Sequence, residues 1–175
     1  ESVGKVIPGV KIKIDYLNNK KFGEILVKSK YLCTGYYLNN GIKYLDRNNY
    51  FRTGDLGYLR NNFLYFKGRN KNMVKINGVS IFLDDIVSML KEDNYVEDCV
   101  AIPIERENNI NPRICLLYEK STYNTNQIKK FCLNKLQIYQ VPTYYFKIDK
   151  IPKNKMNKLN MIEIKKIVTN KLKIN

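Results

Sequence analysis

Residues 50–81 read YFRTGDLGYLRNNFLYFKGRNKNMVKINGVSI, and this stretch decides how the chain is divided. Its first part has apolar runs on both sides of Asn61-Asn62, as expected for two antiparallel strands joined by a tight turn. A basic segment follows, starting at Gly68-Arg69. Because the pattern changes there from strands and turns to mixed helices and strands, we expect a domain boundary beside Gly68.

The region before this boundary, residues 1–67, is predicted to be β-rich. Apolar residues alternate through residues 5–15, and a second apolar run follows Gly23. Asparagine pairs recur between the apolar runs and predict tight turns at residues 18–19, 39–40, 48–49 and 61–62. Short antiparallel strands of this kind predict a barrel-like, curled sheet.

The region after the boundary, residues 68–175, is predicted to be a small mobile α+β domain with a short sheet flanked by helices. Asp84 and Asp85 favour a helix N-terminus at that point, because acidic side chains stabilise the first helical turn. Strands are expected in residues 99–104, 114–119 and 144–152, and helices in residues 126–136 and 161–173. The last helix is amphipathic, which favours core packing and leaves contact with a membrane surface as the alternative.

The chain is strongly basic, with 31 Lys and Arg residues against 16 Asp and Glu residues and a net charge of +15. Such a surface attracts phosphate-rich ligands, nucleic acid or an acidic membrane. The abundance of Lys, Asn, Ile and Tyr is equally consistent with compositional drift. Charge alone therefore names classes of partner without choosing among them.

The chain contains no histidine, which excludes Ser-His-Asp and Cys-His catalysis. Its four cysteines are far apart, which disfavours a zinc site and a disulfide framework, so we expect reduced thiols in an intracellular, reducing compartment. We expect no protein-bound metal. The first residue is Glu, and no signal-peptide pattern follows it, so the chain is interpreted as part of a longer polypeptide.

Asp55 is the first candidate binding residue. It lies in Arg-Thr-Gly-Asp-Leu-Gly, where neighbouring glycines allow close approach of the backbone to a ligand. A carboxylate in this setting is suited to accept hydrogen bonds from a diol such as a ribose. The alternative is that Asp55 only stabilises a turn.

Six segments taken together are more specific than Asp55 alone. They are VGKVIPGVKIKI, GEILVKSKYLCTGYY, YFRTGDLGYL, NFLYFKGRNKNMVKINGVSI, FCLNKLQIYQVP and IPKNKMNKLN. In order and spacing they resemble the C-terminal portion of the adenylate-forming superfamily, which contains acyl-CoA synthetases, peptide synthetase adenylation domains and beetle luciferases. The resemblance covers nearly the whole chain.

The resemblance implies nucleotide-binding roles for two residues. Asp55 matches the aspartate that binds the ribose hydroxyls of ATP and of the acyl-adenylate. Arg69 matches an arginine that also contacts the nucleotide.

The resemblance also places Lys71 at the hinge, near residues 69–72, about which the C-terminal domain swings. Acyl-CoA synthetases often have lysine here.

The resemblance also implies residues for the two half-reactions. Lys158 matches the lysine that holds the carboxylate and the α-phosphate during adenylation, where a compact positive charge stabilises the transition state. Lys75 matches a lysine of the second half-reaction, and Gly78 matches the glycine of the loop that enters the site for the thioester step.

The chain departs from the family pattern next to Lys158. Asn157 replaces the usual glycine, and asparagine tolerates the left-handed backbone conformation that glycine adopts. Lys153 and Lys155 are near enough to compete for the catalytic role. Further back, Leu83 and Asp85 stand where the family often has Pro and Glu.

The function implied is that of an ATP-dependent acyl-CoA synthetase, which joins a carboxylic acid, expected to be a fatty acid, to CoA through an acyl-adenylate. ATP, Mg²⁺ and CoA are the expected cofactors, with the metal bound through the phosphates of ATP. The phosphate loop and the acid pocket belong to an N-terminal portion absent from this sequence, so the chain alone should be inactive. The enzyme is expected to be cytoplasmic or peripheral to an internal membrane.

Three alternatives stay open. The first is an adenylation domain that loads an amino acid or another acid onto a carrier protein. The second is a basic nucleic-acid-binding module, which the scattered lysines and the absence of an RNA-binding signature disfavour. The third is a degenerate homologue retained for protein interaction.

Overall fold

The computed structural model of the chain describes residues 2–16, 21–38, 41–44, 50–105 and 111–172. The chain divides into two compact units, Glu1–Lys71 and Asn72–Asn175. The predicted turns at residues 18–19, 39–40 and 48–49 lie outside the described residues.

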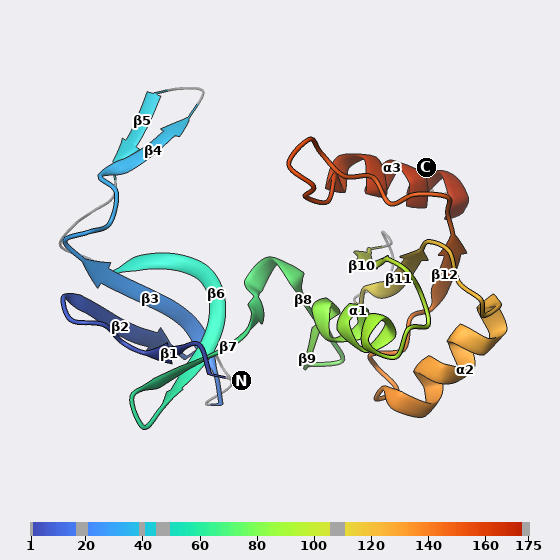
Figure 1. The fold of residues 1–175 in the computed structure, drawn as a ribbon, viewed down its shortest axis with the longest axis horizontal. Coiled ribbons are helices and arrows are strands. Elements are labelled where there is room, and N and C mark those ends of the chain that lie inside the picture. Colours follow the sequence, from blue (N-terminus) through green and yellow to red (C-terminus); the bar gives the residue numbers. More distant parts are fainter. Residues whose placement is uncertain (1, 17–20, 39–40, 45–49, 106–110, 173–175) are drawn as a thin grey trace. The chain divides into compact units, whose positions relative to one another are not determined.

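The first unit is built on an antiparallel five-stranded sheet in the order β1-β7-β6-β3-β2 (Figure 1). Its strands are β1 (Gly4–Lys5), β2 (Val10–Asp15), β3 (Gly23–Ser29), β6 (Phe51–Arg60) and β7 (Phe63–Arg69). A separate two-stranded hairpin consists of β4 (Gly35–Leu38) and β5 (Gly41–Tyr44).

The β6–β7 hairpin confirms the turn predicted at Asn61-Asn62. Both asparagines have positive φ, 52° and 62°, as the two central residues of a mirror-image turn require. Asparagine is one of the few residues that enters this region at modest cost. The turn brings Arg60 opposite Phe63 and sets the register of the hairpin.

The curvature of the first sheet comes from irregular pairing rather than from closure. The register shifts between Leu56 and Gly57, and a β-bulge of this kind bends a strand. A Cβ atom at Gly57 would lie 2.4 Å from the carbonyl oxygen of Tyr65, so only glycine fits there. In the described residues, β1 and β2 are the two edges of an open sheet.

The second unit contains a three-stranded sheet in the order β10-β11-β12. β10 pairs with β11 antiparallel, and β11 pairs with β12 parallel, with α2 as the connection. A short η1 turn and the β8–β9 hairpin precede α1, and α3 ends the described chain (Figure 1). The elements are η1 (Asn70–Asn72), β8 (Met73–Ile76), β9 (Val79–Phe82), α1 (Leu83–Glu92), β10 (Cys99–Ile104), β11 (Arg113–Tyr118), α2 (Thr125–Lys135), β12 (Tyr144–Lys147) and α3 (Met161–Leu172).

Both faces of this sheet are buried, because successive residues of a strand point to opposite faces. One cluster joins Ala101 and Leu116 to apolar side chains of α1 and α2. The other joins Ile102 and Leu117 to Ile151 and to α3. The two-sided core explains why β10 and β11 read as continuous apolar runs.

The three helices confirm the predicted amphipathic patterns. α1 has Asp84 and Asp85 in its first turn, and α2 starts with a capping box in which Asn124 and Gln127 bond each other's backbone N–H groups. α3 buries Ile164 in the sheet cluster, which confirms the core-packing interpretation of the last helix. The predicted α+β fold class is confirmed.

Candidate functional site

Asp55 and Arg69 face each other across the β6–β7 hairpin. They are paired residues of the two strands, and Arg69 Nε donates a hydrogen bond of 3.0 Å to Asp55 Oδ1. The Arg69 side chain is 69% exposed and that of Asp55 is 29% exposed, so both are accessible to a ligand. Among the described residues, Asp55 Oδ2 has no hydrogen-bond partner and remains able to accept one.

Glu24 holds the backbone that leads into Asp55. Its Oε1 accepts a hydrogen bond of 3.1 Å from the Gly54 N–H, and its Oε2 accepts one from Arg52 Nη2. Glu24 is the buried charged residue of the described chain, with a relative exposure of 7%. Hydrogen bonds with Asp15 and Glu24 raise the pKa of Arg52.

Thr53 also fixes the backbone at Asp55. Its hydroxyl donates to the Ile25 carbonyl oxygen at 2.8 Å and accepts from the Asp55 N–H at 3.0 Å. Gly54 between them has a φ of +75°, and a Cβ there would meet no heavy atom within 4 Å. The glycine is thus required by backbone conformation, and the space beside it is open.

Lys71 lies in η1, at the last residue of the first compact unit. Its side chain is exposed. The position is consistent with a pivot between the two units, and the hinge role stays a prediction.

Lys75 and Gly78 belong to one small hairpin. Lys75 is an exposed residue of β8, and Asn77-Gly78 forms the turn to β9 with φ angles of 50° and 78°. The turn is fastened to the rest of its unit, because Asn111 Oδ1 accepts from the Asn77 N–H at 2.9 Å and Asn111 Nδ2 donates to Asn77 Oδ1. Lys75 and Gly78 are therefore presented together on a braced hairpin.

Lys158 lies on an exposed loop before α3 that Asn154 organises. The Asn154 side-chain oxygen accepts from the N–H groups of Met156 and Lys158, at 3.0 and 2.9 Å. The Asn154 N–H donates to the Lys158 carbonyl oxygen at 2.8 Å. Asn157 has a φ of 60°, which is the left-handed conformation expected for a residue in the place of glycine.

Of the two lysines that compete with Lys158, the structure engages one elsewhere. Lys153 Nζ lies 2.6 Å from Asp98 Oδ2. Its hydrogen bond to Asp98 raises the pKa of Lys153. Lys155 is exposed, like Lys158.

Asp98 was not singled out from the sequence, and it binds two lysines. Burial alone would raise the pKa of Asp98, but hydrogen bonds from Lys153 and Lys91, with a further one from the Cys99 N–H, lower it. Asp98 stays ionised down to acidic pH as a result. Glu24 and Asn154 were also missed, and the signal for Asn154 was present, since asparagine often bonds backbone groups a few residues onward.

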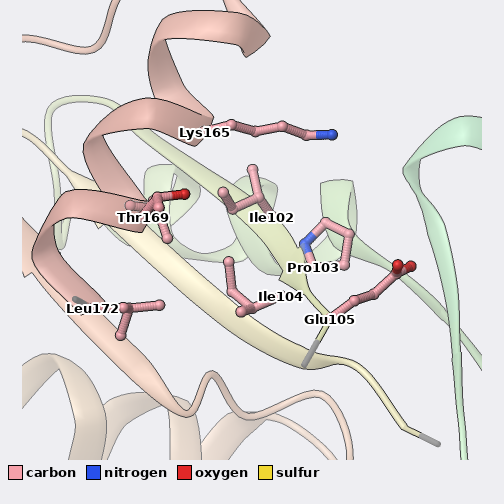
Figure 2. A pocket seen from close by; sticks show the side chains of 8 residues that line it. Ile102, Pro103, Ile104, Glu105, Lys165, Thr169 and Leu172 are labelled. Carbon is pink, nitrogen blue, oxygen red and sulfur yellow. The ribbon is translucent and has the colours of Figure 1, made fainter. Parts of the chain in front are cut away.

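The second unit also has a pocket of about 260 Å³ between the end of β10 and α3 (Figure 2). Ile102 and Ile104 form its apolar side, with Lys165 and Thr169 projecting from α3 and Glu105 at the end of β10. None of the six predicted site residues lines this pocket.

The described residues contain no group of three His, Cys, Asp or Glu side chains placed to hold a metal ion. The site residues are lysines, an arginine and one aspartate, a set that suits anionic ligands and not a cation. No described helix is long and apolar enough to cross a membrane.

Comparisons with known proteins relate the chain to one superfamily, although no protein-family model matches it. The "Putative long chain fatty acid-CoA ligase VraA" of Staphylococcus aureus is 27% identical over 151 residues, covering 86% of this chain and 32% of that protein. The D-alanine–D-alanyl carrier protein ligase of Bacillus licheniformis is 31% identical over 161 residues, covering 84% and 32%.

A solved structure gives the same answer. The o-succinylbenzoate CoA synthetase MenE of Bacillus subtilis, in complex with the acyl-adenylate intermediate OSB-AMP, superimposes with a TM-score of 0.73 and 26% identity. The match covers 94% of this chain and 35% of that one. The homologues and structural neighbours are adenylate-forming enzymes, and the chain corresponds to a C-terminal portion of them. It spans about a third of the length of the curated relatives.

Proposed function

We propose that the chain is the C-terminal part of an ATP-dependent ligase that activates a carboxylic acid as its adenylate and transfers the acyl group to the thiol of CoA. The observation that supports this most directly is the match over 94% of the chain to a CoA synthetase that holds an acyl-adenylate. The rest of the relatives' length would be supplied by a larger N-terminal portion of the same polypeptide. The acid is proposed to be a fatty acid, after the S. aureus relative.

In the first half-reaction a carboxylate oxygen of the acid attacks the α-phosphorus of ATP, and pyrophosphate leaves. Asp55 would accept hydrogen bonds from the ribose hydroxyls, and Arg69, now 3.0 Å from Asp55, would contact the nucleotide beside it. Lys158 would bridge the acid and the α-phosphate. An ammonium group there stabilises the extra negative charge of the transition state, an effect worth about 3 kcal/mol.

In the second half-reaction the thiol sulfur attacks the acyl carbonyl carbon, AMP leaves, and the thiol proton is lost. Lys158 has no role in this step and would withdraw, with Lys71 as the pivot. The braced hairpin of Lys75 and Gly78 would then enter the site. Mg²⁺ would arrive bound to the phosphates of ATP.

A second candidate is transfer of the activated acid to a carrier protein. It is favoured by the identity to the D-alanine–D-alanyl carrier protein ligase, which at 31% exceeds the 27% identity to the S. aureus relative. The two candidates share the adenylation step and differ in the thiol acceptor and in the class of acid expected.

The test uses the full-length polypeptide and measures pyrophosphate release with palmitate, 2-succinylbenzoate or D-alanine. With the acid that is accepted, Lys158→Ala should lower adenylation about 100-fold or more, whereas Lys155→Ala should leave it nearly unchanged. Unchanged pyrophosphate release in Lys158→Ala would overturn the catalytic assignment.

The acceptor is tested next, by supplying CoA or a carrier protein to preformed acyl-adenylate. Thioester formation with CoA supports the first candidate, and formation only on the carrier protein supports the second. Steeply salt-dependent binding of oligonucleotides without any adenylation would instead favour a nucleic-acid-binding module.

A further inference from the structure

Three side chains meet at the start of β10. Asp98 Oδ2 lies 2.6 Å from Lys153 Nζ, and Asp98 Oδ1 contacts Lys91 Nζ at the end of α1. The same Oδ1 accepts from the Cys99 N–H at 2.9 Å. The Asp98 side chain is 14% exposed, so this is a largely buried carboxylate with each oxygen engaged by a lysine.

Lys153 is one end of the loop that carries Lys158. It pairs with Leu159 in an isolated antiparallel bridge, and the Asn160 N–H donates to the Pro152 carbonyl oxygen at 2.9 Å. The base of the loop is thereby closed, and Lys158 lies one residue from the bridge. A shift of Lys153 would be transmitted to Lys158 through this pairing.

Ile151, which leads into the loop, is held by Glu119. Ile151 is buried in the cluster under α3, and its N–H donates to Glu119 Oε1. Glu119 is itself joined to Asp98, because its N–H donates to the Asp98 carbonyl oxygen at 2.8 Å. Asp98 and Glu119 thus fix two successive points of the chain, at Lys153 and Ile151.

We propose that Asp98 is a positioning residue for adenylation: by binding Lys153 it fixes the base of the loop that presents Lys158. This inference rests on the proposed function and adds a residue to it. Asp98 touches no substrate and acts only through the loop. An error of about 1 Å in the placement of a catalytic group can cost up to 100-fold in rate, so a fixed base has a catalytic consequence.

A positioning role for Asp98 predicts different effects on the two half-reactions. Adenylation uses Lys158 and depends on the placement of its loop, whereas thioester formation does not use Lys158. Loss of the Asp98 charge should therefore slow the first step and spare the second. A residue needed only for folding would affect both steps together.

The experiment compares Asp98→Asn with Glu97→Gln in the full-length polypeptide. Glu97 is the adjacent carboxylate, is 62% exposed and pairs at 3.7 Å with Lys120, away from the loop. Two quantities are measured: hydrogen exchange of residues 153–160, and the rates of the two half-reactions with the acid accepted by the wild type.

In Asp98→Asn we expect faster exchange in residues 153–160 and adenylation reduced about tenfold, with thioester formation from preformed acyl-adenylate within twofold of wild type. Glu97→Gln should match the wild type in both measurements. Unchanged exchange would overturn the role of Asp98 in fixing the loop. Faster exchange with normal adenylation, or an equal loss in both half-reactions, would overturn the positioning role.

Two further variants keep the test decisive if Asp98→Asn does not fold. Lys153→Met removes the other partner from a more exposed position and should give the same split between half-reactions, and Lys153→Arg should restore adenylation. If the wild type adenylates none of the acids, the proposed function fails, and if Lys158→Ala adenylates normally, the catalytic assignment of Lys158 fails together with this inference. If Lys158→Ala is defective and the Asp98 and Lys153 variants are normal, only this inference fails.

Discussion

The two compact units differ in how they bury apolar surface. Among the described residues of the first unit, the buried apolar side chains are Ile14, Ile25, Leu26 and Leu56, all on one sheet. In residues 72–175, three helices cover both faces of a sheet and two clusters result. A unit with so few buried apolar side chains is expected to depend on the rest of a polypeptide for its stability, whereas a unit with two apolar clusters is not.

The two units also differ in how exposed their carboxylate–cation pairs are. Asp55 and Arg69 form an accessible pair across a hairpin, and such pairs add little to stability. Asp98 is largely buried and bonds two lysines and a backbone N–H. Accessibility thus distinguishes a carboxylate suited to binding a ligand from one suited to fixing the chain.

The largest expected effect separates the units outright. Residues 72–175 expressed alone should unfold cooperatively in urea, because both clusters lie inside this range. Residues 1–71 alone should show no cooperative transition. Circular dichroism across a urea series checks both. A cooperative transition in the isolated first unit would contradict the comparison of cores.

Thiol reactivity should differ by orders of magnitude between the units. Cys33 is exposed, whereas burial raises the pKa of Cys99 and Cys115 to about 12 and also raises that of Cys132. At pH 8 the buried thiols are protonated and shielded, so one thiol per chain should react quickly with an aromatic disulfide reagent. Cys33→Ser is the control, and fast labelling in that variant would show that the second unit is open.

Asp55→Asn should affect activity rather than stability. We expect kcat/KM for ATP to fall about 10- to 100-fold in the full-length polypeptide, since hydrogen bonds to a charged group are worth about 1.5–3 kcal/mol. The free energy of unfolding should change by less than about 0.5 kcal/mol. Steady-state kinetics and urea unfolding check the two parts, and a large loss of stability would give Asp55 a structural role instead.

The smallest expected effect is that of Asp98→Asn on the free energy of unfolding. We expect a loss of about 1–2 kcal/mol at pH 7, since three hydrogen bonds weaken and solvent screens the two lysines. The folded-state pKa of Asp98 is lowered, so its contribution is complete above the unfolded pKa of about 3.9 and is lost as the pH falls through the folded value. Urea unfolding at pH 7, 5 and 3 should show the difference between wild type and variant persisting at pH 5 and shrinking at pH 3. A constant difference would contradict the charge-based explanation.

The elements of the fold were predictable where local chemistry decides them. The asparagine pair at residues 61–62 predicts a tight turn, and the acidic residues Asp84 and Asp85 predict a helix start. The bulge beside Gly57 was not predictable, because it depends on the carbonyl oxygen of Tyr65 on the neighbouring strand. Curvature arises from pairing between strands, which no single strand encodes.

The residues of the candidate site were likewise only partly predictable from the sequence. Asp55 and Arg69 were predicted from separate motifs, and the hairpin brings them into contact. Glu24 and Asp98 were missed because their contacts with Arg52 and Lys153 span 28 and 55 residues of sequence. The resemblance favoured Lys158 with Lys153 as a nearby competitor, and the ion pair to Asp98 gives a structural difference between the two lysines.

Asn157 shows that a residue other than glycine can form the turn before Lys158. Its φ of 60° shows that the loop needs a backbone shape, which asparagine supplies as glycine does. A signature written as amino-acid letters, with glycine required before the lysine, rejects this chain. A description of the loop by its torsion angles admits either residue before Lys158, because both can adopt a positive φ.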